Sequence, residues 1–339
     1  MNHNHLSAEI LRAGPIELLQ ELVRIPSHPG IHRQEEAVAR EIAGFLECHG
    51  LSCHLLDVHD GRPNLLCSVE AAAEGSHLLL CGHTDTVPLN EGAPGYGFTG
   101  EVVDAFVRGR GAVDMKGALA AMAAALVALN RRGGLRAGRV TLAAVIDEEM
   151  ESLGAEDLVA GGFHADGAIV GEPTLNQICL GHKGLEWLEF VVRGKAALGG
   201  TPEAGVNAIG GASRFIELVR SELIPRFADR ADPIVGPPTL NFGTIRGGDQ
   251  PSTVAAECVL TADRRSVPGE TYESITKELT ELLGRVEADL PGLTTELRRV
   301  PGGMATMEHV ALKTEEDAVV VQAAVRARRR VCRDEGCLL

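Results

Sequence analysis

The pattern of apolar residues along the first half of the chain alternates between two periods. Apolar residues at helical spacing mark three segments, at 15–24, 34–48 and 118–132. Short apolar runs of strand length occupy four others, at 64–70, 77–83, 139–147 and 165–173. Strands that helices cover on both faces are expected to be continuously apolar, as these runs are. Residues 1–183 are therefore predicted to form a three-layer α/β domain.

The pattern changes after Gly184. Apolar and polar residues alternate in 185–194, and the elements that follow are predicted as helix, strand, strand, helix and strand, at 205–223, 239–248, 253–267, 270–290 and 293–300. This β-α-β-β-α-β order predicts a small α+β domain of ferredoxin-like type, spanning 184–298 and inserted into the larger domain. Because a helical pattern returns in the tail, residues 299–339 are interpreted as an incomplete return to the first domain.

Composition narrows the class of protein. A chain of 339 residues with 45% hydrophobic content predicts a globular protein with a sizeable core. Its formal charge of −15 excludes nucleic acid as a partner, since no phosphate-neutralising surface is indicated. The N-terminus lacks the pattern of a signal peptide and no long uncharged apolar run occurs, so we expect no membrane partner and a cytoplasmic location. Eight scattered cysteines without a C-x-x-C pair indicate reduced thiols.

The stretch CGHTDTVP contains the first candidate site residues, His83 and Asp85. Residues at i and i+2 at the end of a strand project to the same side. The aspartate can then accept the spare N–H of the imidazole and fix the tautomer that binds a metal. Taken alone, the stretch is more typical of a surface histidine and aspartate at a strand end.

Two further carboxylates stand in a similar context. Asp114 lies in the glycine-flanked stretch GRGAVDMKG, and Glu172 follows an apolar run in VGEPT. A carboxylate has two oxygens and can bridge two metal ions. Asp, Glu or His thus follows what we predict to be four strand ends, and ligands of open α/β sheets gather beyond the carboxyl ends of the strands. Helix-capping carboxylates would explain one or two of these residues, but not the set.

The run VIDEEMESLG ends a predicted strand in three adjacent carboxylates, at 147–149. One glutamate can ligate a metal while its neighbour takes a proton from a metal-activated water molecule. Cations would also offset the repulsion between adjacent carboxylates. On this interpretation Glu148 is the general base and Glu149 is a ligand.

The motifs in combination resemble a known family. The series HTDTVP, GRGAVDMKG, DEE, VGEPT, GKAALGGTPEAGVNAI and DRRSVPGE is similar to the di-zinc amidohydrolases that include acetylornithine deacetylase, succinyl-diaminopimelate desuccinylase, aminoacylase and a folate-cleaving carboxypeptidase (carboxypeptidase G). The resemblance runs from about residue 15 to about residue 325. It implies a zinc-exopeptidase-like catalytic domain, two zinc ions with cobalt as an alternative metal, and a homodimer formed through residues 184–298.

The resemblance also implies a set of metal ligands. His83, Asp114 and Glu172 would hold one zinc ion, and Asp114 and Glu149 would help to hold the second. The bond between Asp114 and Met115 would be a cis peptide.

Other residues take roles around the metal by the same resemblance. Asp85 would support His83, and Glu148 would be the general base. Arg265, in DRRSVPGE, and Asn207, in GVNAI, would bind the carboxylate of the substrate, an N-acyl amino acid or a small peptide.

The chain departs from the family pattern in two places. The family has a histidine that stabilises the tetrahedral oxyanion in a segment like KAAHGGTP, whereas this chain has Leu198, which cannot donate a hydrogen bond. Loss of one such donor costs about 10²–10³ in rate. Family members also continue through a final histidine that completes the second zinc site, so the chain is interpreted as a C-terminally shortened member.

Three hypotheses follow. The first is a zinc-dependent hydrolase of amide bonds in N-acyl amino acids or small peptides. The second is a truncated or degenerate relative that binds one metal ion and has little or no catalytic activity. The third is an α/β scaffold in which acidic strand ends only cap helices, and it predicts no bound metal.

Overall fold

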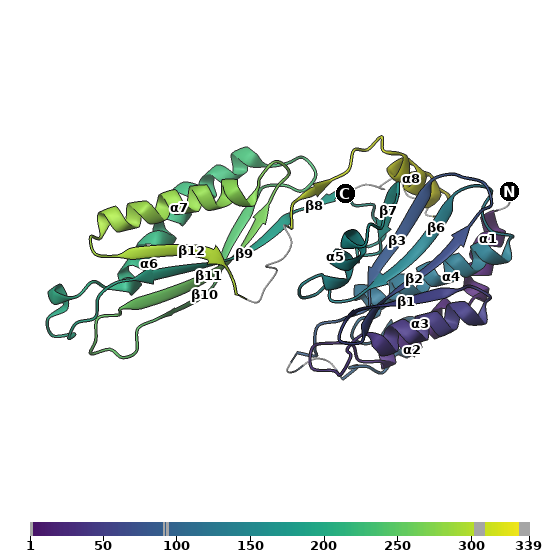
Figure 1. Cartoon of the computed structure of the whole chain (residues 1–339), viewed down its shortest axis with the longest axis horizontal. Helices are drawn as coiled ribbons and strands as arrows, with labels where there is room; N and C mark the ends of the chain where they lie inside the picture. Colours follow the sequence, from purple (N-terminus) through teal and green to yellow (C-terminus); the bar gives the residue numbers. More distant parts are fainter. Residues whose placement is uncertain (1–2, 91, 93–94, 302–308, 332–339) are drawn as a thin grey trace. The chain divides into compact units, whose positions relative to one another are not determined.

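A computed structural model of the chain describes residues 3–90, 92, 95–301 and 309–331, which form two compact units (Figure 1). Unit 1 contains the described residues as far as Ile178 and those from Asp317 onward, and unit 2 contains the described part of Cys179–Glu316. This architecture is the predicted fold class, an α/β domain with a smaller α+β domain inserted.

Unit 1 is built around a mixed sheet. Its elements are α1 (His3–Arg12), α2 (Pro15–Arg24), α3 (Glu36–Cys48), β1 (Cys53–His59), β2 (Arg62–Glu70), β3 (His77–His83), β4 (Glu101–Val103), β5 (Phe106–Arg108), the π-turn η1 (Ala112–Lys116), α4 (Gly117–Arg131), β6 (Arg139–Val145), α5 (Leu153–Ala160), β7 (Gly167–Val170) and α8 (Val319–Val331). The strand order in the described sheet is β1-β2-β6-β3-β7. Strands β3, β6 and β7 run parallel, whereas β2 runs antiparallel to both of its neighbours, β1 and β6.

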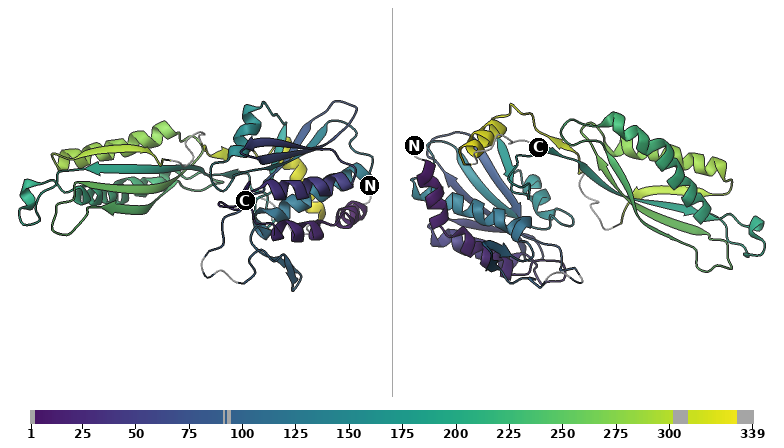
Figure 2. Two further views of the ribbon diagram at one scale, coloured as in Figure 1. Left: turned by 60° about the horizontal axis from the view of Figure 1, so that its bottom comes forward. Right: turned by 180° about the vertical axis from the view of Figure 1, so that it is seen from behind.

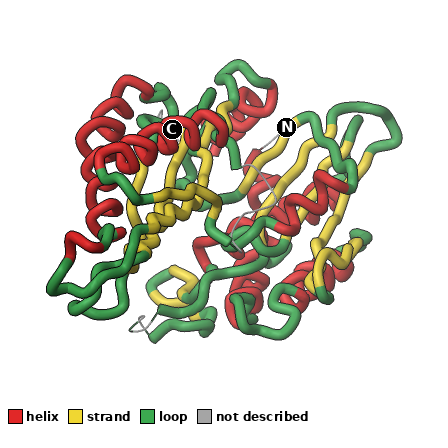
Figure 3. The backbone as a smooth tube through the Cα atoms, turned by 60° about the vertical axis from the view of Figure 1, so that its left-hand side comes forward, coloured by secondary structure: helices red, strands yellow, loops and turns green. Residues whose placement is uncertain are grey.

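Helices cover both faces of this sheet, as Figures 2 and 3 show. Helices α2, α3 and α4 pack with β2, β3 and β6 into one apolar core that includes Leu22, Ile42 and Leu126. Leu158 of α5 packs with Ala143 and Val145 in a separate cluster. Because neighbouring residues of a strand point to opposite faces, this cluster lies on the other side of the sheet.

Helix α4 and the turn before it, Ala112–Arg131, form the one described segment whose length and apolar composition would also suit a membrane span. Half of that apolar window is buried inside the protein. Leu119, Ala123 and Val127 of this helix are buried among the core residues of unit 1. The segment therefore has the packing of a core helix.

Unit 2 contains a four-stranded antiparallel sheet. Its described elements are β8 (Gly181–His182), β9 (Gly184–Arg193), η2 (Pro202–Ala204), α6 (Ala208–Leu218), η3 (Val219–Leu223), η4 (Ile224–Arg230), β10 (Thr239–Gly247), β11 (Glu257–Ser266), α7 (Tyr272–Asp289), β12 (Thr294–Arg299) and β13 (Leu312–Lys313). The main sheet has the order β10-β11-β9-β12. Helices α6 and α7 pack together, and their apolar residues join β9 and β11 in a core centred on Phe190 and Phe215.

Two short strands lie where the chain enters and leaves unit 2. Strand β13 pairs antiparallel with β8, so that Leu312 lies opposite His182. Unit 2 therefore includes segments on both sides of 184–298, the range predicted for the inserted domain. The dimerisation role assigned to that range stays a prediction.

The six described cysteines are free thiols. Cys53 and Cys67 lie opposite each other on β1 and β2. Cys332 and Cys337 lie outside the described residues.

We expect Ile275→Ala to lower the free energy of unfolding by about 2–5 kcal/mol, because Ile275 is 2% exposed in the core of unit 2 and its truncation leaves a cavity. Ile245→Ala is the matched control, since that side chain is 53% exposed. Urea denaturation followed by circular dichroism measures both. Equal losses in the two variants would contradict the assigned core.

Candidate active site

The carboxyl ends of three parallel strands form the candidate site in unit 1. His83, the last residue of β3, lies opposite Val145 on β6, and Cys81 lies opposite Val170 on β7. The chain that leaves β6 contains Glu148 and Glu149, and the chain that leaves β7 contains Glu172. The topology therefore brings these residues to one edge of the sheet.

Asp114 reaches the same edge by a different route. The sequence pattern predicted a strand end before it, but Asp114 lies in the π-turn η1, directly before α4. The strands that come directly before this turn, β4 and β5, form a separate two-stranded hairpin and do not belong to the main described sheet. The peptide bond between Asp114 and Met115 is cis, as the family resemblance implied.

His83 is the centre of the cluster. Its Nε2 lies 3.0 Å from Oδ1 of Asp114, 3.6 Å from Oε1 of Glu172 and 3.8 Å from Oε2 of Glu148. Two groups of potential ligand atoms result, each within 4.8 Å: His83 with Asp114 and Glu149, and His83 with Glu148 and Glu172. The imidazole is 1% exposed, whereas the Asp114 and Glu148 side chains are about half exposed, so the site opens to solvent.

This donor set fits divalent metal ions. One imidazole nitrogen and several carboxylate oxygens are ligands that zinc accepts. Around a tetrahedral zinc ion with bonds of about 2 Å, neighbouring ligand atoms lie roughly 3.3 Å apart, close to the separations from His83. Among the described residues, both groups depend on this single histidine.

Burial and the close approach of several charged groups shift the pKa values of the site residues. Burial disfavours the charge of His83, but Asp114 and Asp85 beside it raise its pKa to about 11. Burial and the neighbouring carboxylates raise the pKa of Glu172 to about 7, although His83 opposes the shift. Burial likewise raises the pKa values of Glu148 and Glu149. The site thus holds more carboxylates than one imidazolium can neutralise.

Asp85 connects His83 to the chain that contains the two glutamates. Nδ1 of His83 lies 3.0 Å from the main-chain oxygen of Asp85 and 3.3 Å from its Oδ1. The Asp85 carboxylate also accepts the backbone N–H groups of Glu148 at 3.1 Å and Glu149 at 2.9 Å. Burial opposes its charge, but His83 and these amide donors lower the pKa of Asp85. Asp85 therefore positions both sides of the site.

Two buried polar residues that the sequence reasoning missed hold the same region. Nζ of Lys116 donates to the main-chain oxygens of Leu22 at 2.9 Å and Ile25 at 2.7 Å, and so ties η1 to the end of α2. Asn64 accepts the N–H of Ile146 and donates to the main-chain oxygen of Gly154. The one sequence signal was a polar residue at the start of an apolar run.

The two predicted substrate-binding residues lie in unit 2. Arg265 is paired with Asp263 through contacts of 2.8 and 3.0 Å. Oδ1 of Asn207 accepts the N–H groups of Ile209 and Gly210, and so caps α6. Leu198, at the position of the expected oxyanion donor, is 73% exposed.

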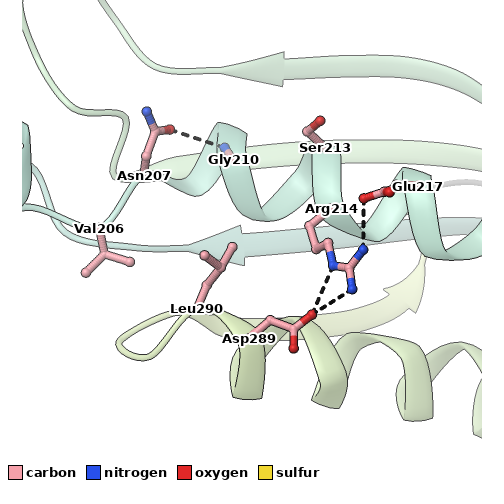
Figure 4. A pocket seen from close by; sticks show the side chains of 8 residues that line it. All are labelled: Val206, Asn207, Gly210, Ser213, Arg214, Glu217, Asp289 and Leu290. Carbon is pink, nitrogen blue, oxygen red and sulfur yellow. Dashed lines mark hydrogen bonds and ion pairs between the residues drawn. The ribbon is translucent and has the colours of Figure 1, made fainter.

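Asn207 also lines a cavity of about 430 Å³ in unit 2, shown in Figure 4. The cavity contains the Arg214 guanidinium, which is paired with Glu217 and Asp289. Since two carboxylates already neutralise this cation, the cavity does not present a free positive charge to an anionic substrate.

Comparison with known proteins agrees with this geometry. Residues 79–332 match the model of Peptidase family M20/M25/M40. Acetylornithine deacetylase of Proteus mirabilis (strain HI4320) is 33% identical over 311 residues, which cover 87% of this chain and 78% of that enzyme. An M20 family metallo-carboxypeptidase of Sulfolobus solfataricus has a TM-score of 0.76 at 19% identity, covering 96% of this chain and 85% of the other. A dinuclear metal binding peptidase of Bacillus subtilis has a TM-score of 0.68 at 16% identity, with coverage of 98% and 82%.

Fold, site and relatives together define the protein as a metal-dependent amidohydrolase or peptidase. More particularly, the chain belongs to Peptidase family M20/M25/M40.

We expect the metal-free protein to bind zinc more tightly at about pH 8 than at about pH 6, with release of protons. Ligation by the predicted ligands would require neutral His83 and ionised Glu172, and the raised pKa values of both groups mean that protons compete with the metal near neutral pH. A rise in pH removes these protons, so affinity rises with pH. Calorimetric titration in buffers of different ionisation enthalpy counts the released protons. Glu172→Gln should release fewer, and binding without proton release would refute the expectation.

Proposed function

We propose that the protein hydrolyses the amide bond of N-acyl amino acids or small peptides, in the manner of a deacetylase, desuccinylase or carboxypeptidase. The observation that carries the proposal is the cluster of His83, Asp114, Glu148, Glu149 and Glu172 at one sheet edge. The identity to acetylornithine deacetylases favours an N-acyl amino acid as substrate. A cytoplasmic location suits such a substrate.

Two zinc ions, or cobalt in their place, are the proposed cofactors. His83, Asp114 and Glu172 would hold one ion, and Asp114 and Glu149 would help to hold the other. Bound at this site, the metal would supply the Lewis acidity that activates water and polarises the amide carbonyl.

Glu148 is the proposed general base. Its carboxylate lies 3.8 Å from Nε2 of His83, beside the proposed ligands, and half of its side chain faces solvent. Burial raises its pKa, which suits a group that must accept a proton and later return it. The Asp85 carboxylate accepts the backbone N–H of Glu148 and so fixes the backbone from which the Glu148 side chain extends.

Arg265 and Asn207 are the proposed contacts for the substrate carboxylate. A guanidinium binds a carboxylate well through two parallel hydrogen bonds, and to do so Arg265 would exchange its partner Asp263 for the substrate.

We also propose a homodimer through residues 184–298. In its support, β10 has β11 as its only partner in the described sheet and leaves an edge open.

A second candidate function is a weakly active or inactive relative that retains metal binding. Leu198 supports it, because this exposed leucine stands where the resemblance expects an oxyanion donor. The two candidates differ in turnover and in metal content, and two substitutions separate them.

We expect Glu148→Gln to lower kcat by about 10²–10⁴, because glutamine keeps the shape of glutamate but cannot accept the proton. The bound zinc should change little, since Glu148 is not a proposed ligand. Hydrolysis of N-acetyl amino acids and elemental analysis measure the two effects. Glu151→Gln is the control for a neighbouring carboxylate outside the cluster. Full activity in the Glu148 variant would exclude its proposed role.

We expect Leu198→His to raise kcat by up to about 10²–10³, since a histidine would restore a hydrogen-bond donor for the developing oxyanion. Leu198→Gln tests whether any polar side chain suffices. Both variants are assayed with bound zinc determined in parallel. If neither variant gains activity while the zinc content is that of two ions per chain, the missing donor is not what limits turnover.

A further inference from the structure

We propose that Arg62 is a positioning residue for the hydrolytic site. It holds the side chain of Asp147 and thereby fixes the turn that presents Glu148 and Glu149. The inference rests on the proposed function for its catalytic consequence, but not for its structural one.

Arg62 lies between two buried carboxylates. Its Nε and Nη2 bind Oε2 and Oε1 of Glu35 at 2.7 and 2.6 Å, and Nη2 also binds Oδ1 of Asp147 at 2.6 Å. The Glu35 side chain is fully buried and that of Asp147 is 7% exposed. The planar guanidinium supplies donors in a fixed geometry that a lysine ammonium cannot reproduce.

Asp147 in turn organises the loop that follows β6. Its φ of 67° is a left-handed conformation that aspartate tolerates better than most residues. Its main-chain oxygen accepts N–H groups from Met150, Glu151 and Ser152 at 3.4, 3.2 and 2.6 Å, and its Oδ2 accepts from Glu151 at 3.2 Å. The side chain that Arg62 holds therefore belongs to the residue around which the whole turn closes.

Two other side chains also bind the backbone of this turn. The Asp85 carboxylate accepts the N–H groups of Glu148 and Glu149. The side-chain oxygen of Asn64 accepts the N–H of Ile146. Arg62 and Asn64 are two residues apart on β2, so their side chains leave the strand on the same side. Of these holding residues, Arg62 is the one that binds the Asp147 carboxylate.

This arrangement explains why three consecutive carboxylates can stand together. Asp147 faces a cation inside the domain, while Glu148 and Glu149 face the cluster of proposed ligands. Without Arg62, two buried carboxylates would lose their shared counter-charge, and the turn would rearrange to reach water.

The test uses Arg62→Lys and Arg62→Met in the full chain, with Arg40→Lys and Arg40→Met as matched controls, because Arg40 pairs with Glu36 on an exposed surface. Hydrogen exchange of residues 147–152 reports the turn without reference to catalysis. We expect exchange at least about tenfold faster in the Arg62 variants, kcat about 10–100-fold lower at saturating zinc, and KM nearly unchanged. Arg62→Lys should retain more activity than Arg62→Met, and the controls should match the parent protein.

Exchange and kcat per folded molecule equal to those of the parent would overturn the proposal. A change confined to KM, or a loss of activity fully explained by a smaller folded fraction, would also overturn the proposal. Should neither Arg62 variant fold, Asp147→Asn decides, since it weakens the same contact in an intact arginine background and must show the same faster exchange. If the parent protein does not hydrolyse amides, the proposed function fails, and the exchange of the turn still decides the role of Arg62.

Discussion

The site depends on one electrostatic constraint: the carboxyl ends of parallel strands bring several acidic side chains to a single imidazole. Burial and mutual repulsion raise the pKa values of Glu148, Glu149 and Glu172, so their ionised forms are disfavoured unless a cation lies near. A divalent ion offsets several carboxylates at once, which protons can do only one at a time. The fold therefore favours binding of a divalent cation beside His83, where the proposed hydrolysis would require it.

Rigidity behind the site comes from buried polar residues whose partners are main-chain groups. Lys116 is fully buried and donates to two carbonyl oxygens at the end of α2, and Asn64 pairs with amide and carbonyl groups beyond β6. An unpaired buried polar group is costly, so each of these pairs fixes the local backbone in one arrangement. The partly exposed carboxylates around His83 can then keep their positions although solvent reaches them.

The sequence pattern predicted the elements that are strongly apolar or strongly periodic. Strands β3 and β6 appeared as continuous apolar runs because helices cover both of their faces, and the element order of unit 2 was correct. Strand β1 was missed because it is an edge strand in which His54 and Asp57 interrupt the apolar pattern. The residue types at the strand ends were predictable, but the pair Arg62 and Asp147 was not, because its members are 85 residues apart and Arg62 belongs to no motif.

Motif residues in unit 2 show why a shared residue type does not by itself establish a role. The Arg265 guanidinium is paired with Asp263, and the Asn207 carbonyl caps α6, so the local fold alone accounts for both residues. A substrate carboxylate would have to compete with Asp263, whereas the Asn207 amide nitrogen can donate while its oxygen keeps the cap. Leu198 has no such alternative, since an aliphatic side chain can neither bind an anion nor donate a proton. On the proposed function, the inserted domain therefore offers no hydrogen-bond donor at Leu198, and the carboxylate cluster of unit 1 would have to supply most of the catalysis.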